Sequence, residues 1–398
     1  MSNILDLHEK NRDLEVSKNP IAPAQQPPKT GAWTRFKEWL KTPKGKKIFI
    51  IIIVGFLIFA AAGFVVYDRY FKKDKSGQNT NQNSPGVNFK KEPEVKKATS
   101  MLDGIKYPES TANRHPLGIM IENHPEARPQ AGLDKAKIVY EAITEGGITR
   151  FMAMYGPESA EKVGPVRSAR TYYLDWCLEY DCFYSHVGGN LDALQLIPKL
   201  GIKDLDQFKY GTQAYWREAE QGKATEHTMF TNTDKLYKIA ENNGWSMSSD
   251  YTSLEFKTEA PLEQRPELSS VIIDFSGPAY KVKWTYDKAS NNYLREMADE
   301  PHNDLLTNKQ LTAKNVIVQE VQRWNAPTEI NEEGWAMKTV GTGNAKIFID
   351  GKVIDGTWKK TNQEARTKYY GTDGKELSFN PGNSWICIVP PDISVTTQ

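Results

Sequence analysis

The sequence predicts an α/β (α+β) N-terminal globular domain with a mixed sheet, a mostly antiparallel β C-terminal domain, and one N-terminal transmembrane helix. Residues 101–260 mix short apolar runs with helical periodicity, whereas residues 261–398 contain only short alternating runs between turn signals. The run Ile48–Tyr67 contains no charged residue. A length of 398 residues agrees with two domains plus appendages.

Composition excludes some classes of function. A hydrophobic content of 39% and a charged content of 25% are typical of a globular chain. The formal net charge of +1 provides no basic field for phosphates, so no nucleic-acid partner is expected. Three cysteines do not indicate a disulfide scaffold. Cys177 and Cys182 are close enough in sequence to pair, but the sequence favours two unbonded small apolar residues.

The N-terminal part predicts a membrane anchor. Residues 1–47 form a basic, Pro-rich tail, and the twenty residues of Ile48–Tyr67 match a hydrocarbon core roughly 30 Å thick. Lysine and arginine close to the run are more numerous before it than after it, which predicts a cytoplasmic N-terminus and an extracellular body. Residues 68–100 are polar and predict a disordered stalk.

The first globular segment predicts five strands and three helices. The strands are expected at 117–121, 136–140, 149–155 and 182–187 and within 224–232, which contains His227, and the first two are far enough apart in sequence to form a parallel pair. Gly164-Pro165 predicts the start of a helix, because proline is favoured in a first helical turn. Apolar periodicity predicts further helices at 190–201 and 233–243.

The second globular segment predicts a β domain, as a barrel or a sandwich. Strands are expected at 271–275, 280–286, 292–295, 315–321, 336–341, 345–349, 352–357 and 384–389. The GTGN sequence at 341–344 has no following helix or Lys-Ser/Thr, so it predicts a β-turn rather than a phosphate loop.

Charged side chains within buried-looking strands indicate either a structural network or a site. A network would join Glu141 and Glu145 to three arginines, whereas a binding site would use those arginines for an anion, with two of them in the first turn of the helix. A catalytic site would use one glutamate as general acid with His186 or His227 as partner. The candidate catalytic residues are Glu141, Glu145 and His186, and the candidate ligand-binding residues are Arg150, Arg167, Arg170, His124, His227 and Glu122.

The histidines do not predict a metal site. His124, His186 and His227 each lie in or after an expected strand, but nothing in their spacing brings them together. No metal and no cofactor is therefore expected.

Several long motifs resemble the YerB-like family of bacterial envelope proteins, a domain of unknown function in two parts. The first part is similar in IMIENHPEARPQAGL, VYEAITEGGITRF, VGPVRSAR, LEYD, HVGGN and EHTMFT, and the second in YDKASNNYLR, NVIVQ, VGTGNAKIFIDGKVIDGTW and DGKELSFNPGNSWICIVP. The resemblance covers about Pro108 to Pro390. It implies an exported protein that is often lipid-anchored, whereas this sequence has the Ile48–Tyr67 run and no lipidation cysteine near its start.

We therefore expect a single-pass, membrane-anchored, extracytoplasmic protein that serves as a binding or scaffold component of the cell envelope. Its partners would be the membrane and a cell-wall glycan, a wall peptide or another envelope protein. The alternative is a cell-wall glycan hydrolase or transferase that uses Glu141 or Glu145 as general acid. The sequence leaves open whether the protein is an enzyme.

Overall fold

The computed structural model divides the chain into two compact units, Met1–Lys90 and Lys91–Gln398. It describes residues 32–49, 95–220, 222–267, 270–331 and 333–397. In the first unit, helix α1 (Ala32–Lys41) carries Phe36 and Trp39 three residues apart, and their ring centroids lie 5.9 Å apart. Among the described residues, none of the helices combines the length and the apolar character that a membrane crossing requires. The expected span Ile48–Tyr67 lies outside the described residues except for its first two positions.

The second unit, called the body below, begins before the predicted end of the stalk. Strand β1 (Lys97–Thr99) pairs antiparallel with β2 (Lys106–Pro108). The prediction of a disordered stalk is therefore wrong for its last residues, while residues 68–94 lie outside the described part of the chain. Strand β1 has little apolar surface, and backbone hydrogen bonds to β2 hold it instead.

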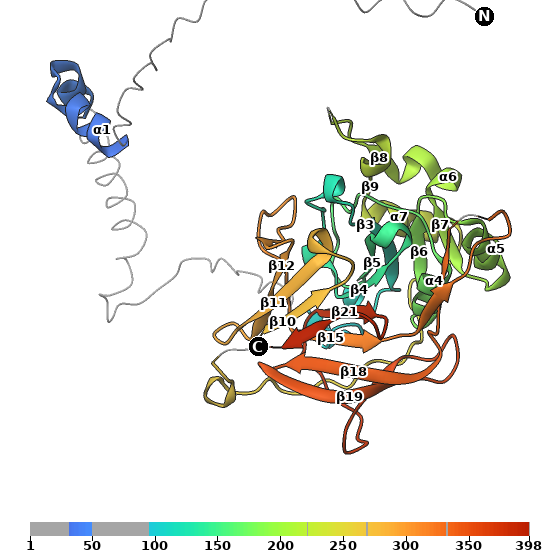
Figure 1. Cartoon of the computed structure of the whole chain (residues 1–398). Coiled ribbons are helices and arrows are strands. Elements are labelled where there is room, and N and C mark those ends of the chain that lie inside the picture. The colour runs from blue at the N-terminus through green and yellow to red at the C-terminus, as the bar shows by residue number, and fades with distance from the viewer. Residues whose placement is uncertain (1–31, 50–94, 221, 268–269, 332, 398) are drawn as a thin grey trace, which may run out of the picture. The chain divides into compact units, whose positions relative to one another are not determined.

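A ten-stranded mixed sheet runs through the body in the order β20-β19-β18-β15-β21-β4-β5-β3-β6-β7 (Figure 1). Its strands are β3 (Leu117–Glu122), β4 (Ile138–Ile143), β5 (Thr149–Tyr155), β6 (Phe183–His186), β7 (Lys203–Asp206), β15 (Asn315–Glu320), β18 (Gly341–Ile349), β19 (Lys352–Lys360), β20 (Lys368–Gly371) and β21 (Ser384–Val389). Both predicted globular segments thus contribute strands to one sheet.

Two of its pairings differ from expectation. The strands β3 and β4 are not partners, because β5 lies between them and pairs antiparallel with each. The segment 149–155 returns directly along β4, which explains this order. The free edge of β4 then pairs in parallel with β21, and Glu141 lies opposite Cys387.

A second sheet is antiparallel, with the order β13-β12-β11-β10-β22 and with β14 also paired to β12. Its strands are β10 (Ser270–Asp274), β11 (Lys281–Asp287), β12 (Asn292–Met297), β13 (Glu300–Pro301), β14 (Thr312–Ala313) and β22 (Val395–Thr397). Two separate pairs are β8 (Tyr215–Arg217) with β9 (Met229–Thr231) and β16 (Arg323–Asn325) with β17 (Trp335–Met337). The mixed sheet predicted for the first segment and the antiparallel sheet predicted for the second are confirmed.

The described helices of the body are short. They are α3 (Glu109–Ala112), α4 (Thr171–Leu178), α5 (Leu191–Lys199), α6 (Gln207–Tyr210) and α7 (Thr233–Asn242), with 3-10 turns η1 (Pro125–Ala127), η2 (Leu133–Lys135), η3 (Glu145–Gly147), η4 (Gly211–Gln213), η5 (Thr225–His227), η6 (Leu262–Gln264) and η7 (Pro278–Tyr280).

The prediction that a helix begins at Gly164-Pro165 is wrong, because α4 begins at Thr171. Residues 165–170 are bonded to the strands beside them: Glu122 N donates to Pro165 O (2.8 Å), and Arg167 N donates to Met120 O (2.9 Å).

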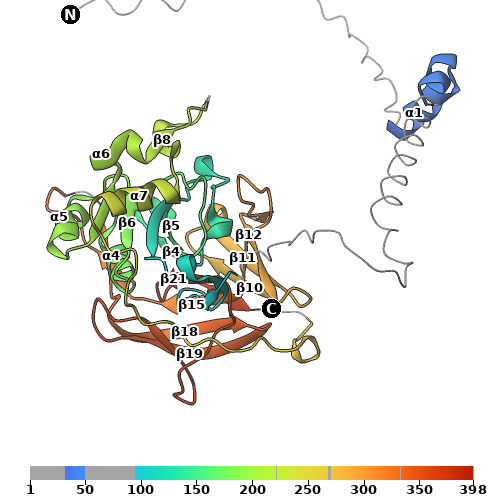
Figure 2. The same ribbon diagram turned by 180° about the vertical axis from the view of Figure 1, so that it is seen from behind.

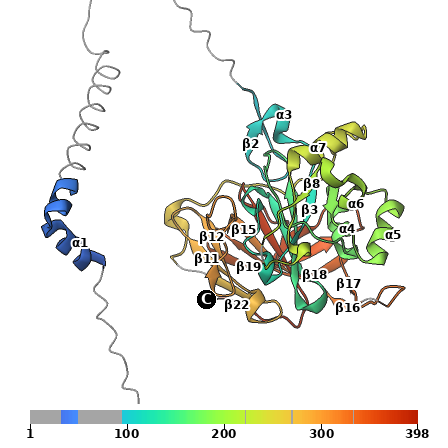
Figure 3. The same cartoon turned by 90° about the horizontal axis from the view of Figure 1, so that it is seen from above.

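The large sheet separates two hydrophobic clusters. Successive residues of β5 enter different clusters: Phe151 and Ala153 pack toward the second sheet, while Met152 and Met154 pack toward α4. Figure 3 shows α4 and α5 on one side of the body and β11 and β12 on the other. Because each cluster contains residues of both segments, the two segments share one core.

A buried ion pair joins the two segments on the side of the second sheet. The Glu141 carboxylate accepts hydrogen bonds from Arg295 Nη2 (2.8 and 3.1 Å), Trp385 Nε1 (2.9 Å) and Thr149 Oγ1 (3.1 Å). Arg295 Nε also donates to His302 Nδ1 at 3.0 Å. Burial, with the charges of Arg295 and Arg128, lowers the pKa of His302 well below its ordinary value, so this ring accepts the bond as a neutral group.

A second buried network joins the segments on the side of α4. Glu179, which follows α4, accepts from Lys360 Nζ at 2.9 Å and from Arg366 Nη1 at 2.5 Å. Burial alone would raise the pKa of Glu179, but the charges of Lys360 and Arg366 outweigh it and lower that pKa.

Close by, Cys177 and Cys182 form a disulfide, so the expectation that they are unbonded apolar residues is wrong.

The GTGN sequence is also not a turn. Residues 341–344 belong to β18 and pair antiparallel with β19. Gly343 packs against the Trp358 indole, where an added Cβ would lie 2.5 Å from Trp358 Nε1. Glycine is therefore required here by close packing of an aromatic side chain.

We predict that Arg295→Met lowers the free energy of unfolding by about 3–5 kcal/mol, because it leaves the Glu141 charge buried without its partner. Denaturant unfolding measures this loss, and the double variant Glu141→Gln/Arg295→Met should recover part of it. The control Lys283→Met removes one member of a partly exposed pair on β11 and should cost at most about 1 kcal/mol. Equal effects of the two single variants would contradict a dominant role for the buried pair.

Candidate functional site

Figure 2 shows the neighbouring strands β4, β5 and β6 with α4 and α7 close to them. Ion pairs join charged side chains from the end of β3, the turn after β4, the segment before α4 and the turn η5. Glu122 lies opposite Arg150 in the sheet, and both face the α4 side, as does Met152. The extended segment 165–170 runs past the end of β3. We call this group the charged rim, and it comprises Glu122, His124, Glu126, Glu145, Arg150, Arg167, Arg170 and His227.

The first part of the charged rim is the pair Glu145 and Arg170. Arg170 Nε lies 2.8 Å from each carboxylate oxygen of Glu145, and Arg170 Nη2 lies 2.7 Å from Oε2. Burial works to raise the pKa of Glu145, but the hydrogen bond and the charge of Arg170 outweigh it, so the pKa is lowered. Glu145 is therefore held as a carboxylate.

Arg150 lies behind this pair and has no carboxylate hydrogen-bonded to it. Its Nη1 donates to Ser168 O at 2.9 Å, and its Nε is buried without a hydrogen-bond partner. Burial and the charge of Arg170 lower the pKa of Arg150, while Glu122 and Glu145 act in the opposite direction. The positive charge of Arg150 is therefore compensated only through space, by the carboxylates of Glu122 and Glu145.

Arg167 is the most exposed arginine of the charged rim, with 31% of its side chain accessible. Its Nε lies 2.5 Å from Glu122 Oε2, while Glu122 itself is buried. Arg167 thereby neutralises a buried carboxylate with one edge of its guanidinium and leaves part of the group open to solvent.

Two histidines complete the charged rim. The rings of His124 and His227 stack in parallel, with centroids 4.7 Å apart. His227 Nδ1 lies 3.7 Å from Glu122 Oε2, and His227 Nε2 lies 3.6 Å from Glu126 Oε2. His124 Nδ1 accepts a hydrogen bond from Glu126 N at 3.3 Å.

The structure thus brings together seven of the nine predicted site residues, namely Glu122, His124, Glu145, Arg150, Arg167, Arg170 and His227. The other two lie elsewhere. Glu141 faces the second sheet, fully buried, and its partner is Arg295 rather than one of the predicted arginines. His186 lies between Gly188 O (2.8 Å) and Asp204 Oδ1 (2.9 Å), so both of its ring nitrogens are occupied.

The predicted placement of Arg167 and Arg170 in a first helical turn is also wrong. Arg167 precedes α4 in the extended segment, and Arg170 is its N-cap residue with extended backbone angles. The argument that a helix N-terminus adds to their attraction for an anion therefore does not apply to Arg167. Sequence reasoning missed Glu126, although it lies two residues after His124 in the quoted motif.

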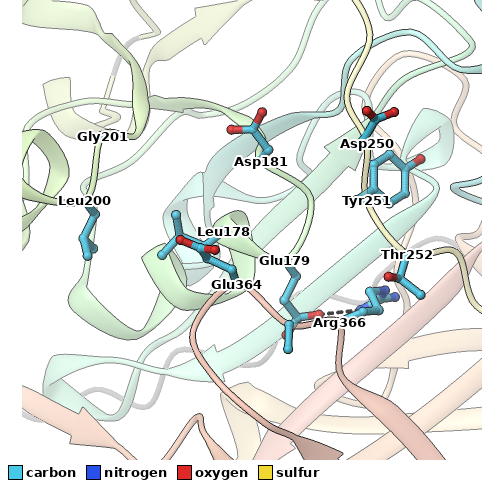
Figure 4. Close-up of a pocket in the computed structure, with 11 residues that line it drawn as sticks. Leu178, Glu179, Asp181, Leu200, Gly201, Asp250, Tyr251, Thr252, Glu364 and Arg366 are labelled. Carbon is cyan, nitrogen blue, oxygen red and sulfur yellow. Dashed lines mark hydrogen bonds and ion pairs between the residues drawn. The ribbon is translucent and has the colours of Figure 1, made fainter.

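A hollow of about 490 Å³ lies beyond the other end of α4 (Figure 4). Glu179 and Arg366 form part of its wall, and these two groups already neutralise each other within the buried network. Asp181, Asp250 and Glu364 add carboxylates around it. The hollow and the charged rim are thus separate features at opposite ends of one helix.

The fold and the charged rim define a class of α+β protein in which two chain segments complete one sheet and share one core. The chain belongs to the DUF3048 family of proteins of unknown function. Its N-terminal domain model matches residues 102–246, and its C-terminal domain model matches residues 271–386. The resemblance seen in the motifs is thereby confirmed.

A relative of known sequence and structure is YerB from Bacillus subtilis. The protein described as "Putative lipoprotein YerB" from strain 168 is 31% identical over 299 residues, which cover 74% of this chain and 87% of that protein. The crystal structure of YerB matches with a TM-score of 0.66 and 29% identity, covering 75% of this chain and 99% of that one. Almost the whole of that solved chain thus corresponds to a part of this one.

We predict that Glu145→Gln removes part of the acid sensitivity of folding. In the folded protein the pKa of Glu145 lies below its ordinary value of 4.5. The Glu145 carboxylate therefore stabilises the fold fully above pH 4.5, and this stabilisation is lost as the pH falls through the lowered pKa. The variant should be less stable than wild type at neutral pH, and the difference should shrink in acid. Denaturant unfolding across this range measures it, and the exposed Glu364→Gln serves as control. A difference that is constant with pH would contradict the lowered pKa.

Proposed function

We propose that this protein is a membrane-anchored, extracytoplasmic component of the bacterial cell envelope that binds an anionic group at the charged rim. The observation that carries the proposal is the convergence of three arginines on that rim, with one of them partly exposed. The bound group would belong to a cell-wall glycan, a wall peptide or a partner protein. The body would act as a binding or scaffold element, not as a catalyst.

Three observations support the location. The relative YerB carries the name of a lipoprotein, and such proteins are held at a membrane by a lipid. The run Ile48–Tyr67 would supply a single-pass anchor here, with the N-terminus in the cytoplasm and the body outside. The bonded pair Cys177 and Cys182 agrees with an oxidising compartment.

The balance of charges supports an anionic ligand. Glu145 neutralises Arg170 and Glu122 neutralises Arg167, but Arg150 has no carboxylate as a hydrogen-bond partner. The open edge of Arg167 offers planar N-H donors that suit carboxylate or phosphate oxygens. An anion bound at the charged rim would supply hydrogen-bond acceptors next to Arg150, whose Nε has no acceptor, and next to the exposed edge of Arg167.

We predict that the body binds soluble anionic fragments of cell-wall polymer and that Arg167→Ala and Arg170→Ala weaken this binding about tenfold or more, because each removes charge-assisted hydrogen bonds. Calorimetric titration of residues 91–398 measures it, since Lys91–Gln398 is one compact unit of the chain. Lys375→Ala removes an exposed cation on the loop after β20 and should bind as wild type does. Equal, weak binding by wild type and both arginine variants would remove the proposal.

The alternative is a glycan hydrolase or transferase with Glu141 or Glu145 as general acid. Such an acid must keep its proton near neutral pH, and enzymes achieve this by raising the pKa. Arg170 lowers the pKa of Glu145, and Glu141 has no contact with solvent. These observations favour the binding function.

We predict that Glu145→Gln does not change the rate of release of reducing ends when the body is incubated with wall glycan. Any release by wild type should equal that of the variant and of a heat-inactivated sample. Turnover by wild type that is lost in a fully folded Glu145→Gln variant would instead establish the enzyme alternative.

A further inference from the structure

We propose that His124, Glu126 and His227 form a binding site for a divalent transition metal of the zinc type. Each residue offers one ligand atom, and these three atoms all lie within 4.8 Å of one another. The ligands come from two segments about one hundred residues apart, the turn η1 after β3 and the turn η5 before β9. This proposal goes beyond anion binding and does not depend on it.

The set of donors selects the type of metal. Two imidazoles and one carboxylate are a ligand set of zinc enzymes, whereas calcium and magnesium prefer oxygen ligands. The expectation of no metal from the sequence considered three histidines, one of which was His186. The structure keeps that residue with Asp204 and adds Glu126 in its place.

The orientation of His227 provides an independent argument. Its Nε2 faces Glu126, while its Nδ1 is buried without a hydrogen-bond partner and lies 3.7 Å from the Glu122 carboxylate. A metal-bound histidine commonly directs its second nitrogen to a carboxylate, which fixes the ring and makes it a better ligand. Glu122 stands where that carboxylate is needed, and Arg167 in turn holds Glu122.

The movement needed to enclose an ion is small. A tetrahedral ion with bonds of about 2.0–2.2 Å holds its ligand atoms roughly 3.4 Å apart. Glu126 can approach because 61% of its side chain is exposed. Coordination through His124 Nδ1 would replace the 3.3 Å hydrogen bond from Glu126 N, which is a long contact and costs little, whereas coordination through Nε2 would keep it.

The charge near the site also favours a cation. Arg167 already neutralises Glu122, so the negative charge that attracts a cation is that of Glu126, which is itself one of the three ligands. The partial exposure of His124 and Glu126 leaves a fourth coordination position open to water or to an anionic oxygen.

The test is a titration of the full-length, tag-free, chelator-treated protein with Co²⁺, followed by competition with Zn²⁺. Tetrahedral Co²⁺ with nitrogen ligands gives a visible absorption band that octahedral aqueous Co²⁺ lacks, so the spectrum reports the coordination itself. We expect one equivalent to bind with this band, Zn²⁺ to abolish it, and Zn²⁺ to raise the Tm by mass action.

Variants separate the site from its surroundings. Glu126→Gln and His124→Ala change partly exposed side chains and should keep the fold, lose the absorption band and weaken Zn²⁺ binding by more than the roughly 10–100-fold that loss of an outer-shell partner costs. Glu226→Gln changes an exposed carboxylate next to His227 and should bind as wild type does. Arg170→Ala should impair anion binding but not the Co²⁺ spectrum, which distinguishes failure of this site from failure of the proposed function.

Two results would overturn the proposal. One is a wild-type Co²⁺ spectrum that remains octahedral. The other is loss of binding by Glu226→Gln equal to that of Glu126→Gln, which would indicate nonspecific attraction to surface carboxylates. In either case the stacked histidines serve only to pack η1 against η5.

Discussion

The interaction on which the rest of the structure depends is the buried pair of Glu141 and Arg295. It fixes the second sheet to the large sheet, and the carboxylate also accepts a hydrogen bond from Trp385 on β21. Removing both charges from water is costly, and only the full set of hydrogen bonds compensates that cost. The pair therefore specifies one relative placement of the two segments, and Glu179 with Lys360 and Arg366 does the same on the opposite face.

This division of charges leaves the charged rim available for another role. The fully buried carboxylates of Glu141 and Glu179 are satisfied by cations of the second segment. The charged rim, in contrast, is built wholly from the first segment and is partly open at Arg167 and Glu126. The charges are thus separated by position: the interior groups Glu141 and Glu179 join the segments, and Arg167 and Glu126 of the charged rim are accessible to solvent.

Much of this could be predicted from the sequence. Alternation and turn signals located most strands, β5 and β21 with their full bounds, and buried charge indicated the charged rim. The second strand was predicted to end at residue 140, three residues before β4 ends, so Glu141 was taken as a strand end instead of a buried residue within the strand. Its partner Arg295, 154 residues away, has no local signal. The first turn of α4 was misplaced because backbone bonds to β3 outweighed the local preference of proline.

The position of β21 has a consequence for biosynthesis. A chain is made from its N-terminus, so β4 has an unpaired edge until residues 384–389 near the C-terminus have been made. The first family segment cannot complete its sheet alone, and a prematurely terminated product would expose the apolar faces of β4 and β5. The body can therefore bury its core only when the polypeptide is nearly complete, and shorter products would be recognised in the cell as unfolded chains.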